Sequence, residues 1–124
     1  MEKTQDALAR VRGAELLGTM DICGCSYEIF LADEIDDAHA LHDGARCKIY
    51  IERNTPDMMH DAFVHEVLHG ILSKSGISRD LEKASIDEEW LVHSLTPWLR
   101  MTFEIKFRLL QSALVGKAKR RSHR

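Results

Sequence analysis

The sequence is poor in the residues that mark several classes of protein. Its 124 residues include two prolines and three cysteines, and only 6% are aromatic. An odd number of cysteines does not provide the paired framework of a small disulfide-stabilised domain. The one-residue gap between Cys23 and Cys25 is also tighter than usual for zinc-binding cysteines, and no fourth ligand beside these two and Cys47 is evident. We therefore interpret the three cysteines as packing residues with reduced thiols.

Long apolar runs are missing as well. No run approaches 18 residues, so we expect no membrane span and no membrane partner. The first residues lack the basic start and apolar block of a signal peptide, which together with reduced thiols favours a cytoplasmic location. A net charge of −3 gives no reason to expect nucleic acid as a partner of the whole domain. Nothing in the sequence indicates an oligomeric state.

The length and composition that remain fit a single domain. Hydrophobic residues make up 44% of the chain and charged residues 30%, as in ordinary globular proteins. We expect an N-terminal arm or short helix over residues 1–18 and the folded domain over 19–115. Residues 116–124 form a basic end without a core residue and are predicted to be disordered.

Alternating apolar residues predict strands in the first half of the chain. Residues 19–23 and 26–31 read as a hairpin, and residues 46–52 as a half-buried strand. The acidic segment 33–43 between them is predicted to be turn-rich.

Helix signals begin at Thr55. This residue can act as N-cap, Pro56 suits the first helical position, and the helix should run to about Ser73 with Gly76 at its exit. A polar connection is expected next.

Residues 77–83 are predicted to form the polar connection after the first helix, and a second helix is predicted to begin near Ser85. We expect a kink or break at Pro97. A third helical stretch, or an extension of the second, is predicted over 103–114. The fold class predicted from these elements is α+β, with a small antiparallel or mixed sheet packed on one helix and one or two C-terminal helices.

The first predicted helix carries the sequence His65-Glu66-Val67-Leu68-His69. Residues four apart lie one turn apart on the same helix face, so His65 and His69 can bind one metal ion. Zinc readily accepts imidazole and is four-coordinate, which leaves places for a third protein ligand and a water. Glu66 can reach that water as general base.

The residues around the motif strengthen this interpretation. They are apolar on nearly every side, as in a buried helix. Two histidines and a glutamate are costly in a buried helix unless something satisfies them, and a metal ion would do so. The alternative is a core helix whose two histidines are hydrogen-bonded and whose glutamate is solvated.

The second predicted helix offers the third ligand. Glu88 lies on the same face as Leu91, Val92 and Leu95, whereas Glu89 is displaced toward the edge of that face. A carboxylate on an apolar face needs a partner, so Glu88 is the first choice for the zinc ligand and Glu89 the reserve. The alternative is that the acids at this position only favour the start of a helix.

At this point the chain resembles a known family. The strands, the His65–His69 motif, and a following helix of the form Glu88-Glu89-x-x-Val92-x-x-Leu95-x-Pro97 are similar to the small gluzincin-like zinc peptidases of phages and prophages. These are related to the repressor-cleaving phage-immunity peptidases. The resemblance covers roughly residues 19–100. It implies a minimal zincin-like core in which His65, His69 and a glutamate of the second helix bind zinc, and Glu66 activates water.

The resemblance also implies that the strand before the active-site helix, here residues 46–52, edges the cleft and pairs with an extended peptide. Tyr50 or His93 could donate a hydrogen bond to the oxyanion. The alternatives are that Tyr50 is a surface strand residue, and that His93 is either solvated or hydrogen-bonded to a metal ligand. Surface positions are predicted for three further histidines: His39, His42 and His60.

The sequence therefore predicts a zinc metallopeptidase that acts on a peptide or protein substrate. The alternative is a non-catalytic, zinc-stabilised regulatory or binding protein of a mobile element, in which four protein ligands would close the metal site. The histidine-only ligand pattern of a ribosomal-RNA endonuclease is absent, because no third histidine follows His69 at short spacing.

Overall fold

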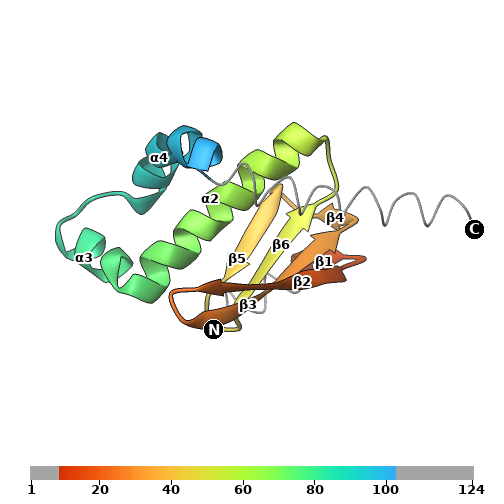
Figure 1. Ribbon diagram of the computed structural model, residues 1–124, viewed down its shortest axis with the longest axis horizontal. Helices are drawn as coiled ribbons and strands as arrows, with labels where there is room; N and C mark the ends of the chain where they lie inside the picture. Colours follow the sequence, from red (N-terminus) through yellow and green to blue (C-terminus); the bar gives the residue numbers. More distant parts are fainter. Residues whose placement is uncertain (1–8, 103–124) are drawn as a thin grey trace, which may run out of the picture.

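A computed structural model describes residues 9–102 of the chain (Figure 1). The strands are β1 (Val11–Arg12), β2 (Glu15–Ile22), β3 (Cys25–Ala32), β4 (Glu34–Ile35), β5 (Ala40–Asp43) and β6 (Lys48–Glu52). The helices are α2 (Pro56–Ser75), α3 (Ile77–Lys83) and α4 (Glu88–Thr102). The predicted α+β class is confirmed. No helix in the described part of the chain has both the length and the apolar character needed to cross a membrane.

Four strands form the main sheet in the order β2-β3-β6-β5. The β2–β3 and β5–β6 pairs are antiparallel, and β3 and β6 are parallel, so the sheet is mixed. Strands β1 and β4 form a separate antiparallel pair.

The predicted hairpin is present as β2 and β3. Cys23 and Gly24 make its turn with φ angles of 51° and 83°, as in the two-residue turns whose twist matches that of antiparallel strands. Strand β2 begins at Glu15, four residues before the predicted start, so the sheet extends into the expected N-terminal arm. Residues 1–8 of that arm lie outside the described part.

The prediction for the edge of the sheet is wrong. Residues 33–43, expected to be turn-rich, contain β4 and β5, and β5 is one of the two edge strands of the main sheet. Strand β6, the expected edge, lies between β3 and β5. The turn interpretation failed because β5 has only four residues and includes His42 and Asp43, whose polar side chains are nevertheless partly or fully buried.

Helix α2 follows the predicted pattern. Thr55 caps it by accepting a hydrogen bond from the backbone N–H of Met58 at 3.3 Å, Pro56 opens it, and Gly76 ends it in the left-handed conformation with φ 87°. The helix runs to Ser75, two residues beyond the expected end.

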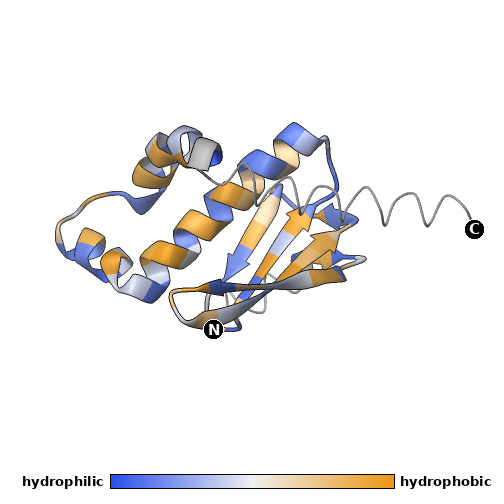
Figure 2. Cartoon of the chain, in the orientation of Figure 1, coloured by the Kyte–Doolittle hydropathy of each residue, from blue (hydrophilic) through white to orange (hydrophobic). Residues whose placement is uncertain are grey.

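Helix α2 is buried on two sides. One side packs on the main sheet, and the other on α3 and α4 (Figure 1). Figure 2 shows hydrophobic residues along α2 as well as along the strands beneath it. The core toward the sheet contains Ile29, Leu31, Ile49, Ile51, Met59, Phe63, Val64 and Val67. On the other side, Leu68 and Leu72 pack with Val92 of α4. Burial of this kind fixes the rotation of α2 and hence the direction of its polar residues.

Two predictions for the C-terminal half need correction. Residues 77–83 form α3 rather than an irregular connection, with Gly76 serving as C-cap of α2 and N-cap of α3. Helix α4 continues through Pro97, so of the predicted kink or break the break is absent. The predicted stretch 103–114 and the tail 116–124 lie outside the described residues.

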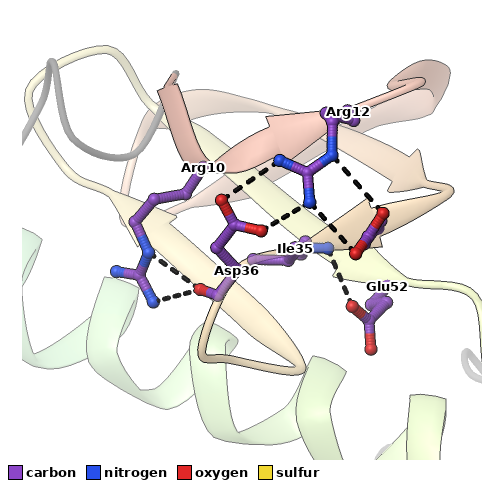
Figure 3. A network of polar contacts seen from close by, with 6 residues as sticks. Arg10, Arg12, Ile35, Asp36 and Glu52 are labelled. Carbon is purple, nitrogen blue, oxygen red and sulfur yellow. Dashed lines mark hydrogen bonds and ion pairs between the residues drawn. The ribbon is translucent and has the colours of Figure 1, made fainter.

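The other face of the sheet carries the β1–β4 pair. Tyr50 of β6 is buried there and stacks on Phe30 with ring centroids 5.2 Å apart, so its predicted surface position is wrong. Arg12 forms ion pairs with Glu34 and Asp36, and Arg10 donates to the backbone carbonyl of Asp36 (Figure 3). These contacts attach the small pair of strands to the loop that follows it.

Candidate metal centre

His65 and His69 lie one turn apart on α2, as the motif predicts. Their ring centroids are 4.9 Å apart, and their side chains are 18% and 16% exposed. Both therefore lie at the boundary between the core and solvent. The packing of α2 on the sheet and on α4 holds them there.

Glu89, in the first turn of α4, lies between the two histidines. Its Oε1 is 2.7 Å from Nε2 of His65, and its Oε2 is 2.8 Å from Nε2 of His69. Within residues 9–102 these three side chains form the one histidine, cysteine and carboxylate group compact enough to hold a metal ion.

Glu88 contacts the other nitrogen of His69. Its Oε2 is 2.6 Å from Nδ1, and the side chain is 29% exposed. Glu89, the reserve choice for the third ligand, thus lies at the two Nε2 atoms, whereas Glu88, the first choice, lies at Nδ1 of His69. Glu88 does lie on the buried stripe of α4 with Val92, as predicted, but the partner it finds there is an imidazole N–H.

The contact with Glu88 has a chemical consequence for His69. When Nδ1 donates to this carboxylate, the neutral ring must present a lone pair at Nε2, which is the form that binds metals. Burial alone would lower the pKa of His69, but the hydrogen bond to Glu88 and the charges of nearby carboxylates raise it overall. For His65, burial dominates and lowers the pKa.

Glu66 lies beside this group and is buried, with 8% exposure. Burial raises the pKa of Glu66 to about 7, partly offset by the charge of His69 and reinforced by that of Glu89. A carboxyl group with such a pKa can accept a proton and release it again near neutral pH.

A cavity of about 230 Å³ opens next to Glu66, between the beginning of β5 and the first half of α2. Its lining residues are His39, Ala40, Met58, Asp61, Ala62, His65 and Glu66. Strand β5 borders this region as the edge of the sheet, and no strand within residues 9–102 pairs with its outer side. An unpaired strand edge can accept an extended peptide by backbone hydrogen bonding.

The two oxyanion candidates differ in their position. Tyr50 lies on the far face of the sheet, away from α2, and cannot serve this site. His93 lies next to it: its Nε2 is 3.8 Å from Oε1 of Glu89, its ring is 5.1 Å from that of His65, and its side chain is 73% exposed.

Two of the three histidines predicted to be at the surface are not there. His60 is buried on α2, and His42 is partly buried on β5, where Nε2 lies 2.8 Å from the hydroxyl of the fully buried Tyr27. Burial, followed by the charges of His69 and Lys74, lowers the pKa of His42 to about 4. His39 is exposed, as predicted.

The cysteines are free thiols, as expected. Cys25 and Cys47 pack against the main core, which confirms their predicted role. Cys23 is exposed in the hairpin turn and does not share that role.

The donor set suits a divalent cation. Two imidazoles face the carboxyl groups of Glu66, Glu88 and Glu89 in a partly dehydrated site, so negative charge is in excess there. Nitrogen and carboxylate donors together match the ligand preferences of zinc. Comparisons with protein-family models, curated proteins and solved structures found no match, so the geometry of the site is the basis for its interpretation.

Proposed function

We propose that the protein is a zinc-dependent metallopeptidase in which His65, His69 and Glu89 hold the metal. One observation carries the proposal. Two Nε2 atoms from a His-Glu-x-x-His helix meet a single carboxylate, with the buried Glu66 and an open cavity beside them. Three protein ligands leave a coordination position for water, as a hydrolytic zinc site requires.

Each residue has a distinct role in this proposal. Zinc bound there would polarise the scissile carbonyl and lower the pKa of a bound water. Glu66 would take the proton of that water and pass it to the leaving amine. Glu88 is a positioning residue, because it holds Nδ1 of His69 and so directs Nε2 toward the metal.

The proposed substrate is an extended peptide or protein segment. Strand β5, rather than the predicted residues 46–52, is the edge available for backbone pairing next to the cavity. On this point the arrangement departs from what the resemblance to the small zinc peptidases of phages and prophages implies, because the strand directly before α2 is internal.

A second candidate function is a zinc-stabilised regulatory or binding protein without catalysis. His93 favours it, because its Nε2 is 3.8 Å from Glu89 and a turn of the exposed side chain would provide a fourth ligand. Four protein ligands would close the site to water. In that case His93→Ala would lower zinc affinity, and the wild-type protein would cleave no peptide.

The decisive experiment compares Glu66→Gln with wild type. We expect the variant to bind one equivalent of zinc, measured by mass spectrometry of the metal, because Glu66 is not a ligand. Its rate of hydrolysis of a mixed peptide library should fall by about 10²–10⁴-fold, the usual contribution of a general base.

The matched control is Glu82→Gln, which removes an exposed carboxyl group on α3. It should leave both zinc content and hydrolysis unchanged. Full peptide-cleaving activity in Glu66→Gln would overturn the proposed mechanism.

A further inference from the structure

The cavity beside Glu66 has a chemical character of its own. We propose that it is a specificity pocket for a basic side chain, Lys or Arg, on a residue flanking the scissile bond, and that Asp61 determines this preference. The inference rests on the proposed peptidase function and adds a substrate class to it.

The position of Asp61 places it next to the reacting centre. Asp61 precedes His65 by one helical turn on α2, so the two side chains lie on the same face of the helix. Both line the cavity, together with Glu66. A side chain that enters the cavity therefore belongs to a residue close to the bond over the metal site.

The walls of the cavity suit an aliphatic stem. Ala40 of β5 and Ala62 of α2 are small, and Met58 is a flexible apolar side chain. Lysine and arginine cover apolar surface with their methylene groups while the charged end remains in a polar or wet environment. A cavity of about 230 Å³ has room for one such side chain rather than for a large ligand.

The charges around the cavity favour a cation. The carboxylate of Asp61 is 58% exposed and lies 3.7 Å from Nη1 of Arg100. Arg100 makes its closer contact, through Nη2, with Asp57. The negative charge of Asp61 is thus only partly balanced and remains open to solvent on the side of the cavity.

His39, the basic residue that precedes β5, does not neutralise the charge of Asp61. His39 lines the cavity, but its Nδ1 is 3.4 Å from Glu52. A cationic substrate group entering the cavity would therefore meet the carboxylate of Asp61, whereas an acidic group would be repelled by it.

The test uses zinc-loaded protein and fluorogenic peptides. A cleavable sequence is first selected from a peptide library, and each of the two residues flanking the scissile bond is then varied to Lys, Leu or Glu. We expect kcat/KM to be highest with Lys at one of these positions. The variant Asp61→Asn should lose about three- to tenfold of the preference for Lys over Leu, as for a partly exposed ion pair.

Asp57→Asn is the matched control. Asp57 has the same partner, Arg100, and lies one turn before Asp61, but it does not line the cavity. It should change the Lys-to-Leu ratio by less than twofold. Equal effects of the two variants would show that Arg100, or the stability of the helix pair, sets the preference, and would overturn the role of Asp61.

Two further measurements separate this inference from the proposed function. The preference for Lys should weaken between 50 and 500 mM salt, about tenfold in ionic strength, because a half-exposed charge is screened. Cleavage that shows no preference for Lys, or prefers Glu, would overturn the pocket assignment and leave the peptidase function standing. If the zinc-loaded protein cleaves no peptide, the proposed function fails and this inference fails with it.

Discussion

Two clusters of charged residues lie on opposite sides of the main sheet, and they differ in balance and burial. In the cluster around Arg12, that residue bridges Glu34 and Asp36, while Arg10 binds a backbone carbonyl (Figure 3). The Arg12, Glu34 and Asp36 side chains are 43–63% exposed. Hydrogen bonding by Arg12 lowers the pKa of Asp36. Cations and anions are matched there, as in a surface network that serves the fold.

The histidine cluster on the α2 side has the opposite properties. Its imidazoles are less than 20% exposed, each contacts a carboxylate at 2.6–2.8 Å, and the carboxyl groups outnumber them. Partly buried groups with excess negative charge require a compensating cation or proton. Both clusters contain close ion pairs, so burial and charge balance, rather than the contacts themselves, distinguish a structural network from a candidate metal centre.

The largest expected effect comes from removing carboxylates of the histidine cluster. Glu89→Ala should lower zinc affinity by at least about 10³-fold, because it removes a proposed ligand, and Glu88→Ala by about 10–100-fold, because it removes a residue that orients a ligand. Competition with a chromogenic chelator measures both affinities.

Glu34→Ala, from the Arg12 cluster, is the control and should leave the affinity unchanged. A larger loss of zinc affinity in Glu88→Ala than in Glu89→Ala would show that Glu88 is the third ligand and would contradict a ligand set of His65, His69 and Glu89.

An intermediate effect is expected for His42, which lies between the sheet and α2. Its pKa of about 4 in the folded protein is below the ordinary 6.5, so the unfolded chain binds more protons between these pH values. The free energy of unfolding should therefore fall as the pH drops from about 6.5 to 4. The loss is at most about 3 kcal/mol, and about 2 kcal/mol after solvent screening.

Urea denaturation at several pH values checks this prediction. His42→Gln can still accept a hydrogen bond from Tyr27 but cannot titrate, so its stability should depend less on pH over this range. His39→Gln, which changes the exposed neighbour of β5, should retain the wild-type dependence. An unchanged pH profile in His42→Gln would contradict the assignment.

The smallest effect is expected in the Arg12 cluster. Arg12→Gln breaks ion pairs between exposed groups, which contribute little to stability and are screened by salt. The midpoint of thermal unfolding should shift only slightly, and zinc affinity should not change. A large loss of zinc in this variant would show that the two clusters are coupled through the sheet.

The features that the sequence predicted best depend on residues close to one another in the chain. The cap at Thr55, the exit at Gly76, and the facing of His65 and His69 each depend on residues within a turn or two of helix. The hairpin β2–β3 was also accessible, since alternation over 26–31 and a glycine turn are local signals.

Tertiary pairing decided what the sequence did not predict. Strand β5 has only four residues, two of them polar, and it is a strand because it pairs with β6 and because His42 forms a hydrogen bond with the hydroxyl of Tyr27. Tyr50 alternates with the core residues of β6, but the β1–β4 pair covers it. No local sequence pattern indicates that β5 will pair with β6 or that the β1–β4 pair will cover Tyr50.

The positions of Glu88 and Glu89 also depend on tertiary packing, which the sequence does not indicate. Both are in the first turn of α4, and which one reaches Nε2 depends on the angle at which α4 crosses α2. The facing rule identified the carboxylate nearer the core correctly. It could not indicate that the deeper carboxylate, Glu88, would contact Nδ1 of His69 and that the more exposed Glu89 would lie at the two Nε2 atoms.

The distance in sequence between the histidines and the glutamates has a mechanical consequence. Glu89 follows His69 by twenty residues, and the intervening segment contains only the end of α2, all of α3 and a connection. An ion held by both would act as a cross-link that closes this loop and reduces the entropy of the unfolded chain. Backbone amides of α3 and α4 should therefore exchange hydrogen faster after chelation, whereas those of β3 and β6 should not.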